Sequence, residues 1–282
     1  MTENQSLQRR LLIYTDLDGT LLDHDSYDTS ATAALRQNLK ALGVPVVWNT
    51  SKTAAELEAL RVALDHTDPY IVENGAALYF PDESTQQPKQ TFGPGHDHIM
   101  NCLEGVKGRF RFKGFHDMTT AEVAAATGLA EPDAALAKQR QFSEPLTWQD
   151  SPAAMSDFLA AMADCGLTVL RGGRFVHILG NFNKATPMRW LNDYYANRWN
   201  AIVETIALGD SQNDIAMLQA ADRAYLIRSP AHVPPQINGQ ANIRIAKGYG
   251  PNGWAEAISS EVHTLVANDE SPDETLTTST QG

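Results

Sequence analysis

The chain has 282 residues, which at about 150 residues per domain predicts roughly two domains and a core large enough to fold without disulfide bonds. Apolar residues make up 43% and charged residues 20%, as in ordinary globular proteins. The 34 acidic residues outnumber the 22 basic ones, and the resulting net charge of −12 disfavours nucleic acids and anionic membranes as partners.

Strand and helix patterns alternate over the first part of the chain. Short apolar runs predict buried parallel strands at residues 11–15, 44–49 and 69–72. Amphipathic or capped segments predict helices at residues 30–42, ending at Gly43, and at residues 54–64. This alternation predicts a Rossmann-like, doubly wound parallel α/β sheet.

The pattern changes between residues 82 and 182. Residues 81–95 are rich in Pro, Gly, Gln and Asp, which is typical of a loop. Helices are then predicted at residues 118–126 and 152–165, and strands at residues 168–170 and 175–179, with Gly172-Gly173 as a two-residue hairpin turn. Because a hairpin implies antiparallel pairing, residues 82–182 are predicted to form a separate, inserted α+β domain.

The alternating pattern returns after residue 183. Helices are predicted at residues 187–195 and 213–220, and strands at residues 204–208 and 224–227. Residues 1–81 and 183–268 are therefore expected to form one core domain. Residues 269–282 carry almost no apolar side chains and are predicted to be a disordered tail.

The cysteine content and the N-terminus indicate a cellular compartment. Cys102 and Cys165 can form one bridge, but reduced thiols in a cytoplasmic protein are the favoured interpretation. The apolar run after Arg9-Arg10 is too short for a signal peptide, and no segment approaches the length of a membrane span. We expect a soluble cytoplasmic protein with no membrane partner, either monomeric or homodimeric.

Two pairs of carboxylates follow predicted parallel strands. Asp16 and Asp18 follow the first strand, and Asp210 and Asp214 follow the strand at residues 204–208. An ordinary polar turn explains the first pair equally well when taken alone, and an acid in the first turn of a helix explains Asp214. Because ligands bind beyond the carboxyl ends of parallel strands, the four carboxylates can converge there. Such a cluster requires a cation, and hard oxygen ligands favour Mg²⁺.

Two further positions suit a phosphate group. Thr50-Ser51 closes the second strand and opens a helix, where free backbone N–H groups and a hydroxyl bind anions; a plain helix N-cap is the alternative. Lys184 precedes the helix at residues 187–195 and can clamp a phosphate as a point charge; a solvated loop lysine is the alternative.

Taken together, these positions resemble the four motifs of the haloacid dehalogenase superfamily of phosphotransferases. The matching residues, in motif order, are Asp16 with Asp18, Thr50, Lys184, and Asp210 with Asp214. The place of the insert, between the second and third motifs, resembles members that carry an α/β (Cof-type) cap.

Nearly the whole chain also resembles the mannosyl-3-phosphoglycerate phosphatases. Among proteins with related caps, Ser143-Glu144-Pro145 and Gly172-Gly173-Arg174-Phe175 favour this group over sucrose-phosphate phosphatases, phosphomannomutases and general sugar phosphatases. The other segments that carry the resemblance are Asn49-Thr50-Ser51-Lys52-Thr53, Val72-Glu73-Asn74-Gly75-Ala76, Phe115-His116-Asp117-Met118, Thr127-Gly128-Leu129, Arg140-Gln141-Phe142 and Val176-His177. The resemblance implies a small phosphorylated sugar as substrate and a role in making mannosylglycerate, a compatible solute.

The resemblance also implies a two-step mechanism. Asp16 attacks phosphorus and becomes an aspartyl phosphate, while Asp18 protonates the leaving oxygen and then activates water. Mg²⁺ is held by Asp16, the backbone carbonyl of Asp18 and Asp210, with Asp214 acting directly or through water. The residues expected to bind the phosphoryl group or its surroundings are Thr50, Ser51, Lys52, Lys184 and Asn213.

The substrate that the resemblance implies carries a glycerate carboxylate beside its phosphate. This carboxylate requires a second cationic site, which we expect on or near the cap. The candidates are Lys52, Lys113, Arg140, Arg171 and Arg174, with His177 for a sugar hydroxyl; surface basic residues are the equally weighted alternative. Arg174 and His177 are three residues apart, so in a regular strand they point to opposite faces and do not both line the pocket; an irregular hairpin is the alternative, in which both can line it. Glu73-Asn74-Gly75 either faces the ligand or forms a turn in which Gly75 has a positive φ.

Other functions remain open at this stage. A phosphatase for glucosyl-3-phosphoglycerate, sucrose phosphate or general sugar phosphates, or a phosphohexomutase, would carry the same core motifs. A sugar-phosphate-binding sensor is the non-enzymatic alternative, which the presence of the complete carboxylate and lysine set disfavours.

Overall fold

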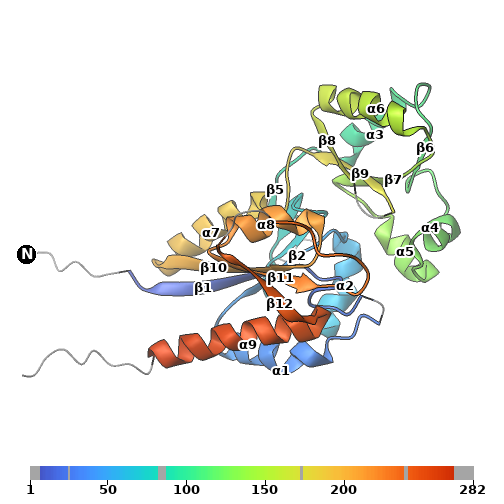
Figure 1. Cartoon of the computed structure of the whole chain (residues 1–282). Helices are drawn as coiled ribbons and strands as arrows, with labels where there is room; N and C mark the ends of the chain where they lie inside the picture. The colour runs from blue at the N-terminus through green and yellow to red at the C-terminus, as the bar shows by residue number, and fades with distance from the viewer. Residues whose placement is uncertain (1–6, 25, 82–86, 172–173, 238–240, 270–282) are drawn as a thin grey trace, which may run out of the picture.

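The computed structural model describes residues 7–24, 26–81, 87–171, 174–237 and 241–269. In these ranges the chain forms an eight-stranded, mostly parallel sheet with the order β12-β11-β10-β1-β2-β3-β4-β5 and a four-stranded antiparallel sheet with the order β6-β7-β9-β8. Figure 1 shows the smaller sheet and its helices as a separate lobe above one end of the larger sheet. The predicted α/β core with an inserted α+β cap is therefore confirmed.

The large sheet is parallel at its centre and antiparallel at one edge. Strands β10, β1, β2 and β3 run parallel, as do β11 and β12, whereas β4 and β5 pair in antiparallel fashion. The strand bounds are β1 Arg9–Thr15, β2 Val46–Asn49, β3 Tyr70–Val72, β4 Ala77–Tyr79, β5 Gln90–Thr91, β10 Ile202–Gly209, β11 Arg223–Arg228 and β12 Ile243–Tyr249.

Helices cover both faces of the large sheet. Alternate residues of β1 serve the two faces: Leu11 and Ile13 belong to one apolar cluster with Trp254 of α9, and Leu12 and Tyr14 to another that includes α7 and α8. Burial on both faces explains why β1 has an uninterrupted apolar sequence. The helix bounds are α1 Ser30–Ala41, α2 Ala54–Ala63, α7 Thr186–Trp199, α8 Ile215–Ala220 and α9 Gly250–Asp269.

The cap sheet carries two pairs of helices. Helices α3 and α6 pack over one apolar cluster of the cap, and α4 and α5 contact each other beside a smaller one. The elements of the cap are β6 Phe112–Gly114, β7 Ser143–Trp148, β8 Leu167–Arg171, β9 Val176–Gly180, α3 His96–Glu104, α4 Thr120–Thr127, α5 Glu131–Ala137 and α6 Pro152–Asp164.

Three sequence predictions need correction or completion. The last pair of the β8–β9 hairpin joins Arg171 to Val176, so the connection is longer than the predicted two-residue turn; Gly172 and Gly173 lie outside the described residues. Residues 81–95 are not all loop, because β5 lies among them and pairs with β4 of the large sheet. The sequence also gave no prediction of β4, β6, β7, β12, α3, α5 and α9.

The domain division at residues 82 and 182 stays a prediction, as does the disordered tail, since residues 270–282 lie outside the described ranges. Cys102 and Cys165 are free thiols. Among the helices of the described chain, none combines the length and the hydropathy needed to cross a membrane.

Candidate active site

Three carboxylates meet where β1 and β10 end. Asp16 directly follows β1, and its N–H donates to the carbonyl of Leu208 in β10 at 2.9 Å, which ties the two strand ends together. Asp210 directly follows β10, and Asp214 closes the short 3-10 helix η1, Gln212–Asp214. One carboxylate oxygen from each of Asp16, Asp210 and Asp214 lies within 4.8 Å of the other two, and all three residues are buried. The predicted convergence of these three side chains is therefore present in the fold.

Lys184 lies inside this cluster. Its side chain is fully buried, and its Nζ lies 2.5 Å from Asp16 Oδ1 and 2.6 Å from Asp214 Oδ1. Burial by itself lowers the pKa of Lys184, but the two carboxylates outweigh burial and raise that pKa above its usual value. The lysine is thus a fixed cation, and the interpretation as a solvated loop residue is wrong.

One lysine does not neutralise three buried carboxylates. Burial, reinforced by the neighbouring carboxylates, raises the pKa of Asp16 well above its usual range in spite of Lys184. Burial and Asp214 likewise raise the pKa of Asp210 to about 6. Burial thus makes the ionised form of these carboxylates costly, and a divalent cation bound to the three hard oxygen donors would offset that cost, which fits Mg²⁺.

Gly19 allows the first and fourth motifs to approach each other. Its φ is +77°, and a Cβ built there would lie 2.6 Å from Asp210 Oδ2. Any larger residue would strain the backbone and push this carboxylate away from Asp16. The Asp-Gly sequence is therefore more than a generic polar turn.

Asp214 has all its oxygens engaged within the protein. Oδ1 faces Lys184, while Oδ2 accepts hydrogen bonds from the N–H groups of Asp210 and Ser211 at 3.1 and 3.0 Å. This is the capping arrangement of an acid at a helix N-terminus, and it also shapes the loop that carries Asp210.

Asp18 lies beside the buried cluster rather than within it. Its side chain is 32% exposed, and Oδ2 lies 3.0 Å from the Nζ of Lys52. Its Oδ1 is buried and has no hydrogen-bond partner among the described residues. The carboxylate can therefore exchange a proton with a group that enters from the cap side.

The segment between β2 and α2 differs from the prediction in one respect. Helix α2 begins at Ala54, and its N-cap is Thr53, whose hydroxyl and Glu56 form a capping box. Thr50-Ser51 therefore does not open the helix, so both the helix-cap interpretation and the expected anion site at a helix start are wrong for these two residues. Thr50 is buried, its N–H donates to the carbonyl of Ile71, and its Oγ1 accepts from the N–H of Lys52 at 3.2 Å.

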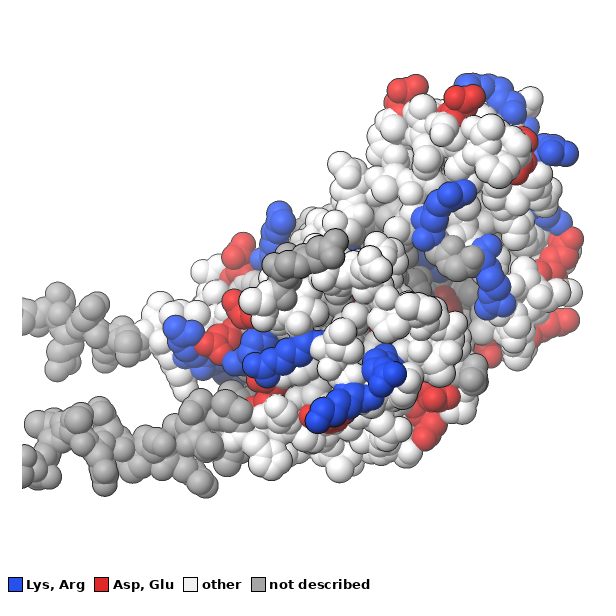
Figure 2. All heavy atoms as spheres, in the orientation of Figure 1, with Lys and Arg blue, Asp and Glu red and all other residues white. Residues whose placement is uncertain are grey.

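A cavity of about 600 Å³ lies between core and cap. Asp18, Ser51 and Lys52 line it from the core, and the cap contributes Arg140, Arg174 and His177. Figure 2 shows the surface hollowed between the two lobes, with basic side chains along the border of the hollow.

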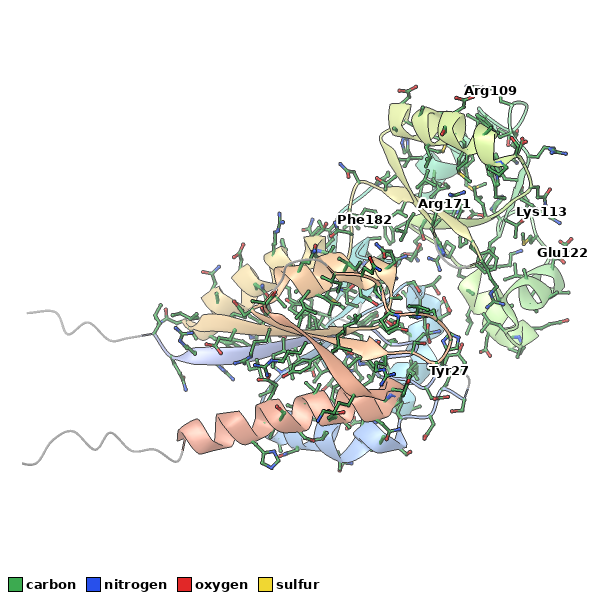
Figure 3. The ribbon with its side chains drawn as sticks, viewed as in Figure 1. Tyr27, Arg109, Lys113, Glu122, Arg171 and Phe182 are labelled. Atoms are coloured by element: carbon green, nitrogen blue, oxygen red, sulfur yellow. The ribbon has the colours of Figure 1, made fainter. Side chains whose placement is uncertain are left out.

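The other two basic candidates of the cap, Lys113 and Arg171, do not line this cavity. Lys113 does not line this cavity: its Nζ pairs with Glu122 at 2.6 Å on the outer face of the cap, where Figure 3 labels both. Arg171 lines a neighbouring cavity of about 410 Å³ together with Asn213 and His177. Lys113 is thus the one candidate cation that the fold places away from the site.

The expectation that Arg174 and His177 face apart is wrong. Strand β9 begins only at Val176, so Arg174 precedes it and the alternation of a strand does not apply to this pair. Both residues line the same cavity. Arg174 also donates to the carbonyls of Ala126 and Thr127 at the end of α4, at 3.3 and 2.7 Å.

His177 is a neutral hydrogen-bonding group. Burial, together with the nearby Arg140, lowers its pKa to about 4. Its Nδ1 is buried without a hydrogen-bond partner among the described residues. A ligand hydroxyl in the cavity is a suitable partner for this nitrogen.

The sequence analysis did not find two residues of this region. His232 Nε2 lies 3.0 Å from Asp210 Oδ2, but its segment has no strand or helix period that could place it beside the carboxylates. Tyr27 lines the cap cavity, with a positive φ of 57° and its ring 5.1 Å from Lys52 Nζ. Figure 3 shows Tyr27 on the core side of the gap.

Glu73-Asn74-Gly75 forms a turn after β3, and Gly75 has the expected positive φ, +102°. The side chain of Glu73 faces backbone N–H groups of the cap rather than a ligand. Asn74 Oδ1 accepts from Asn213 Nδ2 at 2.9 Å, which connects this turn to the loop after β10.

Comparison with known proteins agrees with this geometry. Residues 13–122 match the family model of haloacid dehalogenase-like hydrolases. A glucosyl-3-phosphoglycerate/mannosyl-3-phosphoglycerate phosphatase of Methanococcoides burtonii is 36% identical over 261 residues, 88% of this chain and 95% of the relative. A protein of the same name from Persephonella marina is 33% identical over 259 residues, 88% of this chain and 96% of the relative.

Solved structures show the same fold at greater distance. A phosphatase of the haloalkanoate superfamily from Bacteroides thetaiotaomicron, BT1666, is 19% identical, with a TM-score of 0.66 over 94% of this chain and 98% of that one. The chain therefore belongs to the haloacid dehalogenase-like hydrolases, and within that family it is a phosphoric monoester hydrolase.

Proposed function

We propose that the protein is a Mg²⁺-dependent phosphatase that converts mannosyl-3-phosphoglycerate to mannosylglycerate and phosphate through an aspartyl-phosphate intermediate. The observation that carries this proposal is the buried Asp16–Lys184 pair at the end of β1, close in the chain to Asp18, which lines the cavity between core and cap. The names of the relatives, both glucosyl- and mannosyl-3-phosphoglycerate phosphatases, support the substrate class.

In the first step an oxygen of Asp16 attacks phosphorus, and the bond between phosphorus and the ester oxygen breaks. Asp18 donates a proton to that leaving oxygen, which departs as a hydroxyl. In the second step Asp18 takes a proton from water, the water oxygen attacks phosphorus, and the bond between phosphorus and the Asp16 oxygen breaks, which releases phosphate and restores the Asp16 carboxylate. The position of Asp18 at the cavity, outside the buried cluster, suits both transfers.

Lys184 is proposed to bind the transferring phosphoryl oxygens, together with Thr50, Ser51 and Asn213. Mg²⁺ would be held by Asp16, Asp210 and the backbone carbonyl of Asp18, and it supplies positive charge beside the phosphoryl group. Because both oxygens of Asp214 already have donors, we assign Asp214 to the positioning of Lys184 and of the Asp210 loop.

The cap residues divide the remaining substrate groups between them. Arg174 bonds only to neutral carbonyls in the contacts that the structure describes, so its charge remains available to a glycerate carboxylate. The charge of Arg140 is already offset by Glu73 at 3.4 Å. His177, which is neutral, suits a sugar hydroxyl. Lys52, which pairs with Asp18, is placed at the phosphate side of the cavity.

The deciding experiment is phosphate release from mannosyl-3-phosphoglycerate and from its glucosyl analogue, with and without Mg²⁺, beside a panel of other sugar phosphates. We expect the two glycosyl-phosphoglycerates to exceed sucrose phosphate and hexose phosphates in kcat/KM. Preferential release from another sugar phosphate would replace the substrate assignment. Transfer of the phosphoryl group to another hydroxyl would show a mutase, and binding without any hydrolysis would show a sensor.

Asp16→Asn tests the covalent route. The variant should fold normally and lose turnover, because an amide cannot form the acyl phosphate. Circular dichroism checks the fold, and acid-quench trapping with labelled substrate should detect phosphoprotein in the wild type only. Substantial residual activity in Asp16→Asn would exclude the aspartyl-phosphate route.

We further propose that the protein acts in the cytoplasm as a monomer or homodimer. Its two free thiols fit a reducing compartment. Size-exclusion chromatography with light scattering would determine the oligomeric state.

A further inference from the structure

The turn after β3 has a left-handed backbone at three consecutive residues. The φ angles are +50° at Glu73, +64° at Asn74 and +102° at Gly75. Non-glycine residues rarely adopt this conformation, so two of them in succession persist only where surrounding contacts hold them. The contacts of this turn therefore indicate what it does.

The backbone of the turn and the side chain of Asn74 hold the catalytic loops of the core. The N–H groups of Glu73 and Asn74 donate to the carbonyls of Lys52 and Thr50 at 3.0 and 2.9 Å. Asn74 Oδ1 accepts from Asn213 in the loop after β10. The turn thus connects two of the loops that carry the proposed phosphoryl site.

The side chain of Glu73 extends to the cap instead. It is 1% exposed, and its carboxylate accepts hydrogen bonds from the N–H groups of Gln141 and Phe142, at 2.9 and 3.1 Å, and from Ser143 Oγ at 2.7 Å. These donors lie in the segment that enters β7. One core carboxylate therefore binds three consecutive residues of the cap.

The same carboxylate fixes Arg140, a residue that lines the substrate cavity. Arg140 Nε lies 3.4 Å from Glu73 Oε2, and the arginine side chain is only 5% exposed. Its Nη2 also donates to the core carbonyl of Ser51 at 3.1 Å and to Ser143 Oγ at 2.7 Å. Without Glu73, a buried guanidinium would lose its anionic partner at the cavity wall.

We propose that Glu73 is a positioning residue that sets the cap, through Arg140 and residues 141–143, in register with the phosphoryl site, and thereby holds the cap wall of the substrate cavity in place. The proposal rests on the proposed phosphatase function. Two neighbouring side chains of one turn thus contact different domains: Glu73 binds the cap, and Asn74 binds a loop of the core.

Glu73→Gln tests this assignment because it keeps the shape of the side chain and the hydrogen bond of the Glu73 main-chain N–H, but removes the charge and one of the two acceptor oxygens. We expect kcat/KM for the glycosyl-phosphoglycerate to fall about 10- to 100-fold, mainly through a higher KM, because the cap residues that bind the substrate are displaced. The inhibition constant of orthovanadate, which occupies only the phosphoryl site, should stay within about two-fold, since the core loops keep their contacts.

Two controls separate this effect from loss of any buried carboxylate. Glu261 is also buried and paired with an arginine, its Oε2 lying 3.2 Å from Arg223 Nε, but it belongs to α9, so Glu261→Gln should change neither parameter. Asn74→Gly keeps the positive φ without strain and releases Asn213. Asn74→Gly should raise the inhibition constant of vanadate and lower kcat/KM by similar factors.

The proposal is overturned if Glu73→Gln weakens vanadate inhibition by the same factor as kcat/KM, or if it leaves both unchanged. Should Glu73→Gln fail to fold, Ser143→Ala replaces it, because it removes one hydrogen bond to the Glu73 carboxylate. Ser143→Ala should lower kcat/KM by a smaller factor and leave vanadate inhibition unchanged. The wild-type substrate panel tests the proposed function separately. If the panel selects another phosphorylated sugar, the Glu73 measurements are made with that sugar.

Discussion

Lys184 shows at the scale of one residue how the site depends on burial. A lysine with no exposed surface remains charged because Asp16 and Asp214 lie at hydrogen-bond distance. Lys184→Met should therefore leave two buried carboxylates without their cation and lower the free energy of unfolding by about 3–5 kcal/mol. The loss should be smaller at pH 5 than at pH 8, because the carboxylates of the variant can take up protons.

Urea denaturation at both pH values measures this effect. Lys113→Met is the matched control, since it removes an ion pair of similar length from the cap surface, and should cost less than about 1 kcal/mol. Equal losses for the two variants would contradict the role given to the buried pair.

At the scale of the secondary-structure elements, two glycines in turns or helix ends have a positive φ but lie in different surroundings. Gly128 is the C-cap of α4 with φ +82°, and a Cβ there would meet open space. A Cβ on Gly75 would lie 2.2 Å from the carbonyl oxygen of Asn183, directly before Lys184.

We expect Gly128→Ala to lower the free energy of unfolding by about 1 kcal/mol, the cost of a positive φ alone. Gly75→Ala should cost about 3 kcal/mol or more, because an overlap adds to the backbone strain, and should also lower kcat. Thermal unfolding with activity assays checks both, and equal effects would show that the close approach is unimportant.

At the scale of the whole molecule, buried histidines make stability depend on pH. Burial lowers the pKa of His66, which is stacked on Trp48 with ring centroids 3.8 Å apart, to about 3, and that of His177 to about 4. The unfolded chain titrates near the usual histidine value of about 6.5. Between these values the unfolded state binds protons that the folded state does not, so stability is complete above pH 6.5 and falls as the pH decreases towards 4.

Each histidine contributes at most about 1.4 kcal/mol per pH unit to this slope. His66→Phe keeps an aromatic ring against Trp48 and removes one titrating group. Denaturant unfolding of wild type and variant from pH 7.5 to 4.5 should show that the free energy of unfolding falls less steeply with decreasing pH in the variant, by up to that amount per pH unit. Identical slopes would show that His66 does not titrate on unfolding.

The sequence by itself determined the features that depend on local chemistry. Apolar runs followed by carboxylates placed Asp16, Asp18 and Asp210 at strand ends, because a buried parallel strand and its polar exit are both local patterns. The two ends of helix α4, capped by Thr119 and Gly128, could be predicted for the same reason. Short strands such as β5 and β6 were not, since a few residues carry no usable period and their pairing partners are distant.

The parallel-sheet pattern predicted that the carboxylates converge, but only the tertiary structure showed which partners Lys184 and Glu73 have. Nothing near Lys184 in the chain shows that it is buried between Asp16 and Asp214, residues that lie 168 and 30 positions away. The same holds for Glu73, whose partners in the cap lie about 70 positions further along. The sequence thus determined which chemical groups end each strand, whereas packing determined which of them share a buried, low-dielectric space, where charge is costly unless it is paired.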